Sequence, residues 1–180
     1  MPAARHDTAV PDDGLFEAFV REYQDMVYAV AVRLLGHPAD AEDVAQTVFL
    51  RAYERFGEIA CRPTVAGWLK TVTTNLCLTH LTRHRARWQS FSDVTASDAG
   101  TAFDVAASDE NPADALLRAD RTARLERALA RLPAHQRVPL VLFHFEQRSY
   151  EDIAQLLDVS LGKLKTDMHR GRLALRKVLI

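Results

Sequence analysis

The side chains best suited to bind a polyanion lie near the carboxyl end of the sequence. Residues 160–180 contain six cations and a single acid, Asp167. Lysine neutralises phosphate, arginine forks onto guanine, and threonine and histidine hydrogen-bond to base edges. These residue types occur together in one short stretch: Lys163, Lys165, Thr166, His169, Arg170 and Arg172. The combination favours contact with double-stranded DNA.

A helix would present these side chains on one face. Apolar residues recur at helical spacing over residues 161–178, and Thr166, His169 and Arg170 point away from that stripe. Ser160 stands directly before the helix and is a typical N-cap residue. The free backbone N–H groups of the first turn, at residues 160–163, form a seat for a phosphate.

A second, shorter helix is predicted just before it, over residues 150–157, with Ser149 as its N-cap. Ala154 is small, as the close crossing of two helices requires. The hydroxyl of Ser160 is expected to accept the backbone N–H of Lys163. Four apolar residues would fill the corner: Ile153, Leu157, Val159 and Leu164. Two short helices with a tight corner predict a helix-turn-helix.

The rest of the chain also has helical periodicity, and no strand pattern interrupts it. Further helices are expected at residues 16–34, 40–56, 68–85, 113–132 and 136–145, with a loop at residues 57–67. Residues 93–114 contain six acids and no Lys or Arg, whereas residues 59–92 contain five cations and no acid. We therefore expect an all-α fold of two small helical bundles joined by a flexible linker. The expected divisions are a leader at 1–14, bundles at 15–89 and 113–180, and an acidic linker at 90–112.

Composition narrows the class of protein. The chain has 180 residues, a formal net charge of −1 and 48% hydrophobic residues, which are values of a globular protein. No apolar run approaches the roughly 20 residues that a membrane-spanning helix needs, and no secretory signal begins the chain. Two cysteines cannot form a disulfide framework, so a reducing, cytoplasmic setting is expected.

Both halves resemble bacterial sigma factors of the extracytoplasmic-function (ECF) type. Residues 150–154 (YEDIA), 159–162 (VSLG) and 165–172 (KTDMHRGR) look like the fourth conserved region of that family. Residues 40–53 are similar to the polymerase-binding helix of its second region. Residues 66–69 (AGWL), followed by Asn75-Leu76 and an arginine-rich tail, are similar to its promoter-melting helix. The two motifs stand in the family's order and spacing.

The resemblance implies a role for each half. The first half would bind core RNA polymerase and open the promoter near −10, with residues 57–67 capturing a flipped base. The second half would read the −35 element. The implied polymerase contacts are Asp43 and Gln46, and the implied −10 contacts are Trp68, Lys70, Asn75, Arg83 and Arg85. The implied −35 contacts are Ser160, Gly162, Lys163, Lys165, Thr166, His169, Arg170 and Arg172. Family members are commonly inhibited by an anti-sigma factor, so that partner is implied as well.

Four positions depart from the family pattern. Thr47 and Thr79 replace common acids, and Thr71 replaces a frequent basic residue. Asp167 stands where a basic residue is common in the reading helix, and phosphate would repel an acid there. The promoter sequence therefore cannot be carried over from the family.

A metal site is the main alternative use of one helix. Cys77, His80 and His84 follow i, i+3, i+7 spacing, with Cys61 upstream. Zinc accepts such ligands, but the spacing matches no common structural-zinc signature. We therefore expect no metal and no other cofactor.

Three other functions fit the sequence less well. A sigma-like decoy that binds only an anti-sigma protein should have an eroded reading helix, which the cations of residues 160–180 argue against. A stand-alone helix-turn-helix regulator would give residues 40–53 no role. An enzyme would need a convergent catalytic group, and the sequence has no Gly-rich phosphate loop or triad motif, so we expect no enzymatic activity.

Overall fold

The computed structural model describes residues 13–83 and 112–179, and every regular element in these two ranges is an α-helix. The all-α expectation is confirmed. Most of the expected leader and the expected linker lie outside the described residues, as do Arg85 and His84. None of the described helices has the length and hydropathy needed to cross a bilayer.

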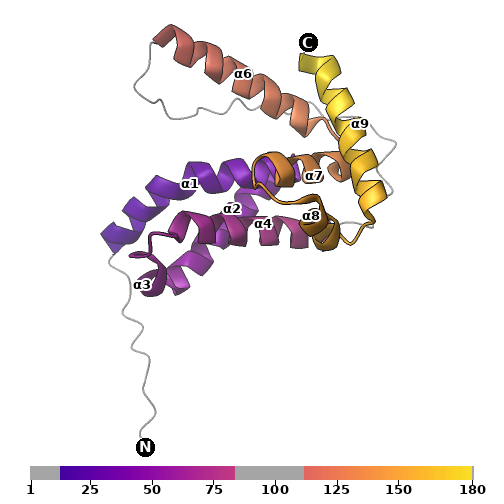
Figure 1. Ribbon diagram of the computed structural model, residues 1–180. Coiled ribbons are helices and arrows are strands. Elements are labelled where there is room, and N and C mark those ends of the chain that lie inside the picture. Colours follow the sequence, from indigo (N-terminus) through magenta and orange to yellow (C-terminus); the bar gives the residue numbers. More distant parts are fainter. Residues whose placement is uncertain (1–12, 84–111, 180) are drawn as a thin grey trace, which may run out of the picture.

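The N-terminal half contains α1 (Asp13–Leu35), α2 (Pro38–Glu54), α3 (Phe56–Ile59) and α4 (Val65–Arg83). Helix α1 packs along both α2 and α4 (Figure 1). Their shared core is closed by fully buried apolar side chains, including Val27, Leu34, Val48 and Leu69. Pro38 begins α2 because its missing N–H is not needed in a first helical turn.

The short helix α3 lies where the sequence predicted only a loop, so that part of the expectation was wrong. Phe56 and Ile59 are buried, and the Phe56 ring packs edge-on against Phe16 at 5.3 Å and Phe19 at 5.4 Å between centroids. These two apolar side chains, three residues apart, stabilise a single helical turn. A helix of four residues is too short to show a helical period in the sequence, so it could not be predicted in this way. The chain then turns directly into α4.

The C-terminal half contains α6 (Pro112–Ala130), α7 (Ala134–His144), α8 (Tyr150–Leu157) and α9 (Leu161–Leu179). Helix α9 crosses α7 at Gly171, where an added Cβ would lie 2.7 Å from Leu140 Cδ1. Only glycine therefore fits this crossing without a shift of the leucine. The other fixed points of α9 are Leu164 and Met168, which are fully buried against the core.

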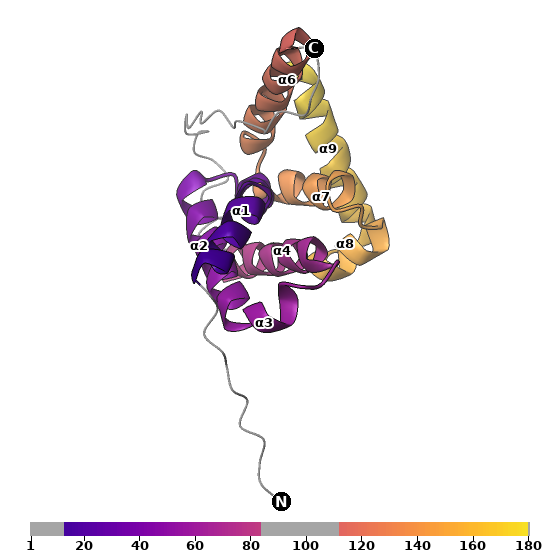
Figure 2. The same cartoon turned by 90° about the vertical axis from the view of Figure 1, so that its left-hand side faces the viewer.

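The two halves also contact each other, which the sequence did not predict. The C-terminal end of α1 packs against α7 and, to a smaller extent, against α6. Figures 1 and 2 show α7 beside this end of α1, while α8 lies beyond the end of α4. The helices that carry the candidate binding residues are thus held in one arrangement by an interface between residues about 100 apart in sequence.

Candidate nucleic-acid interface

Both helices of the helix-turn-helix are capped as the sequence predicts. The Ser149 hydroxyl accepts the backbone N–H of Asp152 at 3.1 Å, at the start of α8. The Ser160 hydroxyl accepts the backbone N–H of Lys163 at 3.3 Å, at the start of α9, which confirms the expected N-cap. Each bond satisfies one of the amide groups that a first helical turn leaves free, and so fixes where each helix begins.

The corner between α8 and α9 is set by backbone geometry and apolar packing. Asp158 adopts the left-handed conformation, with φ 53° and ψ 52°, which aspartate tolerates better than most residues. The Val159 N–H then bonds to the Ala154 carbonyl at 3.0 Å. Ile153 is fully buried under the corner and Ala154 is buried beside it. This local structure orients α9 against α8.

The outward face of α9 carries Thr166, His169 and Arg170, and the other residues expected to contact the −35 element lie at its flanks or at its start. All eight residues are exposed: Ser160, Gly162, Lys163, Lys165, Thr166, His169, Arg170 and Arg172. Within the described residues, Lys165, His169 and Arg170 have no side-chain hydrogen bond or ion pair. These three groups can therefore reach a ligand without first breaking an internal contact.

Four of the eight side chains have partners within the protein: Ser160 caps α9, and the Thr166 hydroxyl donates to the Gly162 carbonyl at 2.9 Å. The other two are Lys163 and Arg172. The Lys163 ammonium contacts the Asp167 carboxylate at 2.9 Å. Arg172 donates to the Tyr150 hydroxyl at 3.0 Å, and its guanidinium lies 5.7 Å from the centroid of the Phe143 ring. The Phe143 and Tyr150 rings are stacked at 4.9 Å. Arg172 thus braces α9 against α7 and α8 while its side chain remains exposed.

Asp167, one of the departures from the family pattern, has an orientation that the sequence did not predict. The residue is only 8% exposed and lies on the buried side of α9, in the same stripe as Leu164, Met168 and Gly171. Its carboxylate therefore does not face a bound phosphate directly. The carboxylate instead pairs with the Lys163 ammonium and partly neutralises its charge.

The α4 residues expected near −10 do not form a single cationic face. Trp68 is half-buried and packs against the core, and Asn75, seven residues later on the same helical face, is exposed. Arg83 is exposed at the end of the helix. Lys70 is half-buried and lies on another side of α4, so the structure does not bring it to Trp68 and Asn75.

Apart from Arg83 at its end, the exposed face of α4 around Asn75 is polar and uncharged. Thr71, Thr79 and Thr82 are exposed beside Asn75. Each threonine hydroxyl donates to a carbonyl of its own helix, as in the bond from Thr79 to Asn75 at 2.8 Å. Two of these threonines stand out in the sequence as departures from the family pattern, but the stripe they form was not predicted. The i, i+4, i+8 spacing of Thr71, Asn75 and Thr79 in the sequence could have predicted this polar stripe.

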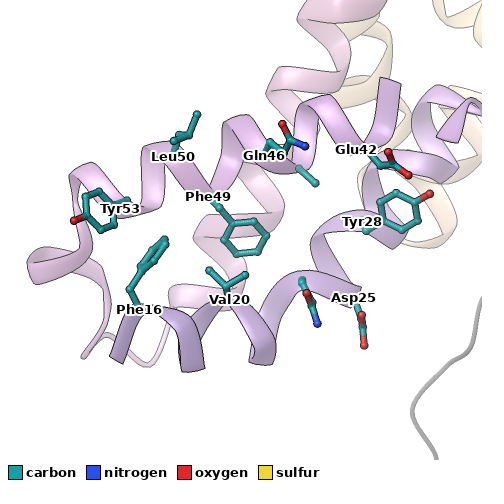
Figure 3. Close-up of a pocket in the computed structure, with 11 residues that line it drawn as sticks. Phe16, Val20, Asp25, Tyr28, Glu42, Gln46, Phe49, Leu50 and Tyr53 are labelled. Atoms are coloured by element: carbon teal, nitrogen blue, oxygen red, sulfur yellow. The ribbon is translucent and has the colours of Figure 1, made fainter. Parts of the chain in front are cut away.

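A groove between α1 and α2 forms a second candidate surface (Figure 3). It measures about 870 Å³ and is lined mainly by apolar and aromatic side chains, with Gln46 at its rim. Asp43, the other expected polymerase contact, is exposed on α2 but does not line the groove. Glu42, Phe49, Leu50 and Tyr53 belong to the segment that resembles the polymerase-binding helix, but the sequence assigned them no contact. The α1 wall of the groove, which includes Phe16, Val20 and Tyr28, was not predicted.

Leu50 was the clearest missed signal in this groove. It is 67% exposed on α2, although it lies between the buried residues Val48 and Ala52. One exposed leucine is ordinary on a protein surface, but Leu50 also lines the apolar groove, and a contiguous exposed apolar surface is typical of a contact with another protein. On the opposite wall, burial and the nearby charge of Glu42 raise the pKa of Tyr28.

The described members of the alternative metal site, Cys61, Cys77 and His80, do not form a metal-binding group, and His84 lies outside the described residues. Cys77 is fully buried, and burial raises the pKa of its thiol to about 12, whereas Cys61 is exposed between α3 and α4. His80 instead lies 3.6 Å from the Asp40 carboxylate. Within residues 13–83 and 112–179, no group of three or more His, Cys, Asp or Glu residues could hold a metal ion.

Comparison with known proteins covers both halves. Residues 19–87 match the family described as Sigma-70 region 2, and residues 122–175 match the family described as Sigma-70, region 4. The chain is 34% identical to the RNA polymerase sigma-H factor of Pseudomonas aeruginosa over 93% of this chain and 88% of that protein. It is 29% identical to the ECF RNA polymerase sigma factor SigW of Bacillus subtilis over 93% of this chain and 90% of that protein.

The fold has a counterpart among solved structures. The sigma factor RpoE of Bartonella quintana, solved in complex with the anti-sigma factor NepR, superposes with a TM-score of 0.52 at 21% identity. The match covers 91% of this chain and 96% of that one. Together with the exposed cationic face of α9, these matches establish that the chain belongs to the sigma-70 family, as an ECF-type RNA polymerase sigma factor.

Proposed function

We propose that this sigma factor divides promoter recognition between α9 and α4 and binds core RNA polymerase through the groove between α1 and α2. The observation that carries the proposal is the set of unengaged side chains Lys165, His169 and Arg170 on a capped, exposed helix. As a sigma factor the protein is regulatory rather than catalytic.

In this proposal α9 enters the major groove at the −35 element. Arg170 and His169 are placed to contact base edges, while Lys165 neutralises a backbone phosphate. The Ser160 cap leaves further amide groups of the first turn free to bind a second phosphate, and Gly162 leaves open space around them. The turn between α8 and α9 fixes the angle at which these groups meet the major groove of the DNA.

At the −10 element, α4 acts on the separated strand. Trp68 offers a ring face at the start of the helix, and Asn75 offers donor and acceptor groups two turns further along the same face. Opening then occurs because these groups bind the unstacked strand better than the duplex, which shifts the equilibrium toward the open form. Arg83 supplies a cation at the end of this surface, and Arg85 follows it two residues later in the sequence.

The polymerase contact is assigned to α2 and the groove beside it. Gln46 at the rim and the exposed Leu50 present a polar and an apolar group about one turn apart on α2. An apolar anchor surrounded by polar groups is the usual anatomy of a protein–protein contact. We also propose an anti-sigma factor as a partner and the cytoplasm, where the polymerase acts, as the location.

Runoff transcription with core RNA polymerase on a pool of genomic promoters tests the proposal. The chain should produce discrete transcripts, and Leu50→Asp should abolish them by weakening polymerase binding. Leu156→Asp is the matched control, since Leu156 is 40% exposed on α8 and lies outside the proposed groove. Absence of any promoter-specific transcript with the parent chain would contradict the proposal. Equal loss of polymerase binding in both variants would contradict the groove assignment.

A further inference from the structure

Arg172 is held by two aromatic side chains from neighbouring helices. Its Nη2 donates to the Tyr150 hydroxyl at 3.0 Å, and its Cζ lies 5.7 Å from the centroid of the Phe143 ring. The two rings are stacked, with their centroids 4.9 Å apart and an angle of 13° between their planes. Phe143 belongs to α7, Tyr150 begins α8 and Arg172 lies on α9, so the three side chains join all three helices.

The partners of Arg172 differ in kind from the partner of Lys163. The Lys163 ammonium pairs with the Asp167 carboxylate at 2.9 Å, which partly neutralises its charge. A phenol and a phenyl ring carry no net charge, and Arg172 forms no ion pair within the described residues. The guanidinium therefore keeps its full positive charge, while its orientation is restricted by the hydrogen bond and by attraction to the ring.

The end of α7 is close enough to sense this charge. Burial and the positive charge of Arg172 lower the pKa of His144, the last residue of α7. Because an unperturbed histidine already titrates near pH 6.5, the His144 imidazole is neutral at pH 7. At neutral pH His144 therefore adds no second positive charge beside Arg172.

Arg172 lies at the edge of the proposed DNA-reading surface. At about 100° per residue it is about 20° from Lys165 around α9, and at about 1.5 Å per residue it lies about 10 Å further along the helix axis. The Arg172 side chain is exposed. Its bond to Tyr150 uses one N–H of a guanidinium that has five, so the others can bind a further acceptor.

We propose that Tyr150 and Phe143 are positioning residues for promoter binding, which hold the Arg172 guanidinium ready to bind a backbone phosphate at the edge of the −35 element. This step rests on the proposed function of α9. A guanidinium presents its N–H groups as a planar fork that matches a phosphate, and phosphate contacts fix the orientation of a protein on the duplex. An arginine that is already held loses fewer rotamers on binding than a free one, so its contact is stronger.

The arrangement gives Arg172 a different role from Arg170. Arg170 has no internal partner within the described residues, so its side chain can adjust to a base edge, whereas Arg172 is fixed relative to α7 and α8. Every base pair offers the same phosphate acceptor. Loss of the positioning residues should therefore weaken binding to different promoter sequences by a similar factor.

A double-mutant cycle on the holoenzyme tests the positioning role. Binding is titrated at several salt concentrations on a promoter taken from the runoff pool. Arg172→Ala should weaken binding and lower the slope of log affinity against log salt by about one, because one phosphate is no longer neutralised. Tyr150→Phe removes only the hydroxyl, so it should weaken binding by about threefold to fivefold without changing the slope. In the Arg172→Ala background, Tyr150→Phe should have no further effect.

Two further variants control for an effect on stability. Tyr23→Phe removes the hydroxyl of a tyrosine on α1, outside the groove lining and outside α9, and should leave binding unchanged. Phe143→Leu keeps an apolar side chain but removes the ring, so it should weaken binding in the parent and not in Arg172→Ala.

Three results of the cycle would overturn the positioning role. The first is an equal loss from Tyr150→Phe in both backgrounds, which would assign Tyr150 to fold stability. The second is an unchanged affinity of Tyr150→Phe in the parent background. The third is an unchanged salt slope in Arg172→Ala, which would show that Arg172 binds no phosphate.

The arrangement in the free factor is measured without DNA. Nuclear magnetic resonance relaxation of the arginine Nε–H groups should give Arg172 a higher order parameter than Arg170, and Tyr150→Phe should lower the value for Arg172. Arg172→Ala should also raise the pKa of His144, because it removes a nearby positive charge. Equal mobility of Arg170 and Arg172, or an unchanged pKa of His144, would overturn the assigned contact. Absence of promoter binding by the parent holoenzyme would instead reject the proposed function, while the order parameters would still decide whether Arg172 is held.

Discussion

The two helices proposed to contact promoter DNA differ in the chemistry of their exposed faces. Helix α9 presents unengaged cations, among them Lys165 and Arg170, on a rigid capped element. Helix α4 presents an uncharged stripe of threonines around Asn75, and each threonine hydroxyl is already bonded to its own helix. Affinity for duplex DNA should therefore reside mainly in the C-terminal half, while the N-terminal half selects the separated strand by shape, stacking and amide hydrogen bonds.

This difference separates two measurable quantities. Contacts with phosphates release counterions and make binding dependent on salt. Contacts of a neutral amide or a ring with an unstacked base depend much less on salt. Variants on α9 should change duplex affinity and its salt dependence, whereas variants on α4 should change the fraction of open promoter.

The largest effect is expected from removing the cations of α9. Lys165→Ala with Arg170→Ala should weaken holoenzyme binding to a matched promoter by about tenfold to hundredfold, since a good base contact contributes about 1–3 kcal/mol. The slope of log affinity against log salt should fall by about one for each phosphate that the variant no longer neutralises. Arg131→Ala, which removes an exposed cation between α6 and α7 rather than on α9, is the control. An unchanged slope of log affinity against log salt in the double variant would mean that Lys165 and Arg170 do not contact phosphates. The contrast between a cationic α9 and a neutral α4 would then not explain DNA binding.

A smaller and different effect is expected on α4. Asn75→Ala should reduce promoter opening by about fivefold, because removing a hydrogen bond costs about 1 kcal/mol. Permanganate reactivity of unpaired thymines measures the opening, and duplex affinity with its salt slope should be unchanged. Glu54→Ala, an exposed change on α2, provides the control for general disturbance of this half. A weaker duplex affinity in Asn75→Ala would assign α4 to duplex binding instead.

Adding a cation to α4 tests the neutral stripe directly. Thr79→Arg should strengthen promoter binding by about threefold at low salt and add about one to the salt slope, because one further phosphate is neutralised. The hydroxyl bond to the Asn75 carbonyl that this change removes is local to the helix, so the fold should remain intact. Binding titrations at several salt concentrations measure both quantities. No change in slope would place this face away from DNA.

The smallest effect is expected at Asp167. Asp167→Asn removes the charged partner of Lys163 and should free its ammonium for phosphate, with about a twofold gain in affinity that disappears at high salt. Competition binding of parent and variant holoenzymes to one promoter resolves a difference of this size. A decrease in affinity would mean that Asp167 holds Lys163 in its binding position rather than restraining it.

Local signals in the sequence predicted the helix-turn-helix well. The Ser149 and Ser160 caps, the small Ala154 and the buried Ile153 depend on residues at most four apart, and the structure bears out each of them. The exposed cations of α9 followed from the same helical period. Local spacing therefore sufficed to place one complete candidate surface.

Features formed by distant residues could not be predicted in this way. Arg137 looked like an ordinary residue near a helix start, because its partners at Leu34 and Leu35 are about 100 residues away. The burial of Asp167 and its pairing with Lys163 could not be predicted from one acid in a basic helix, because they depend on how α9 packs. The groove between α1 and α2 required two helix faces to be combined, and only one of them carries a recognisable motif.

Gly171 has a practical consequence for engineering factors with new promoter preferences. Its bare α-carbon leaves room for Leu140 at the seat of α9 on α7, and an added Cβ, 2.7 Å from Leu140 Cδ1, would require that leucine to shift. Positions 165, 166, 169 and 170 can be varied in a library because they leave that seat unchanged. Promoter specificity can thus be redesigned by single substitutions at these positions, provided that Gly171 and its packing against Leu140 are kept.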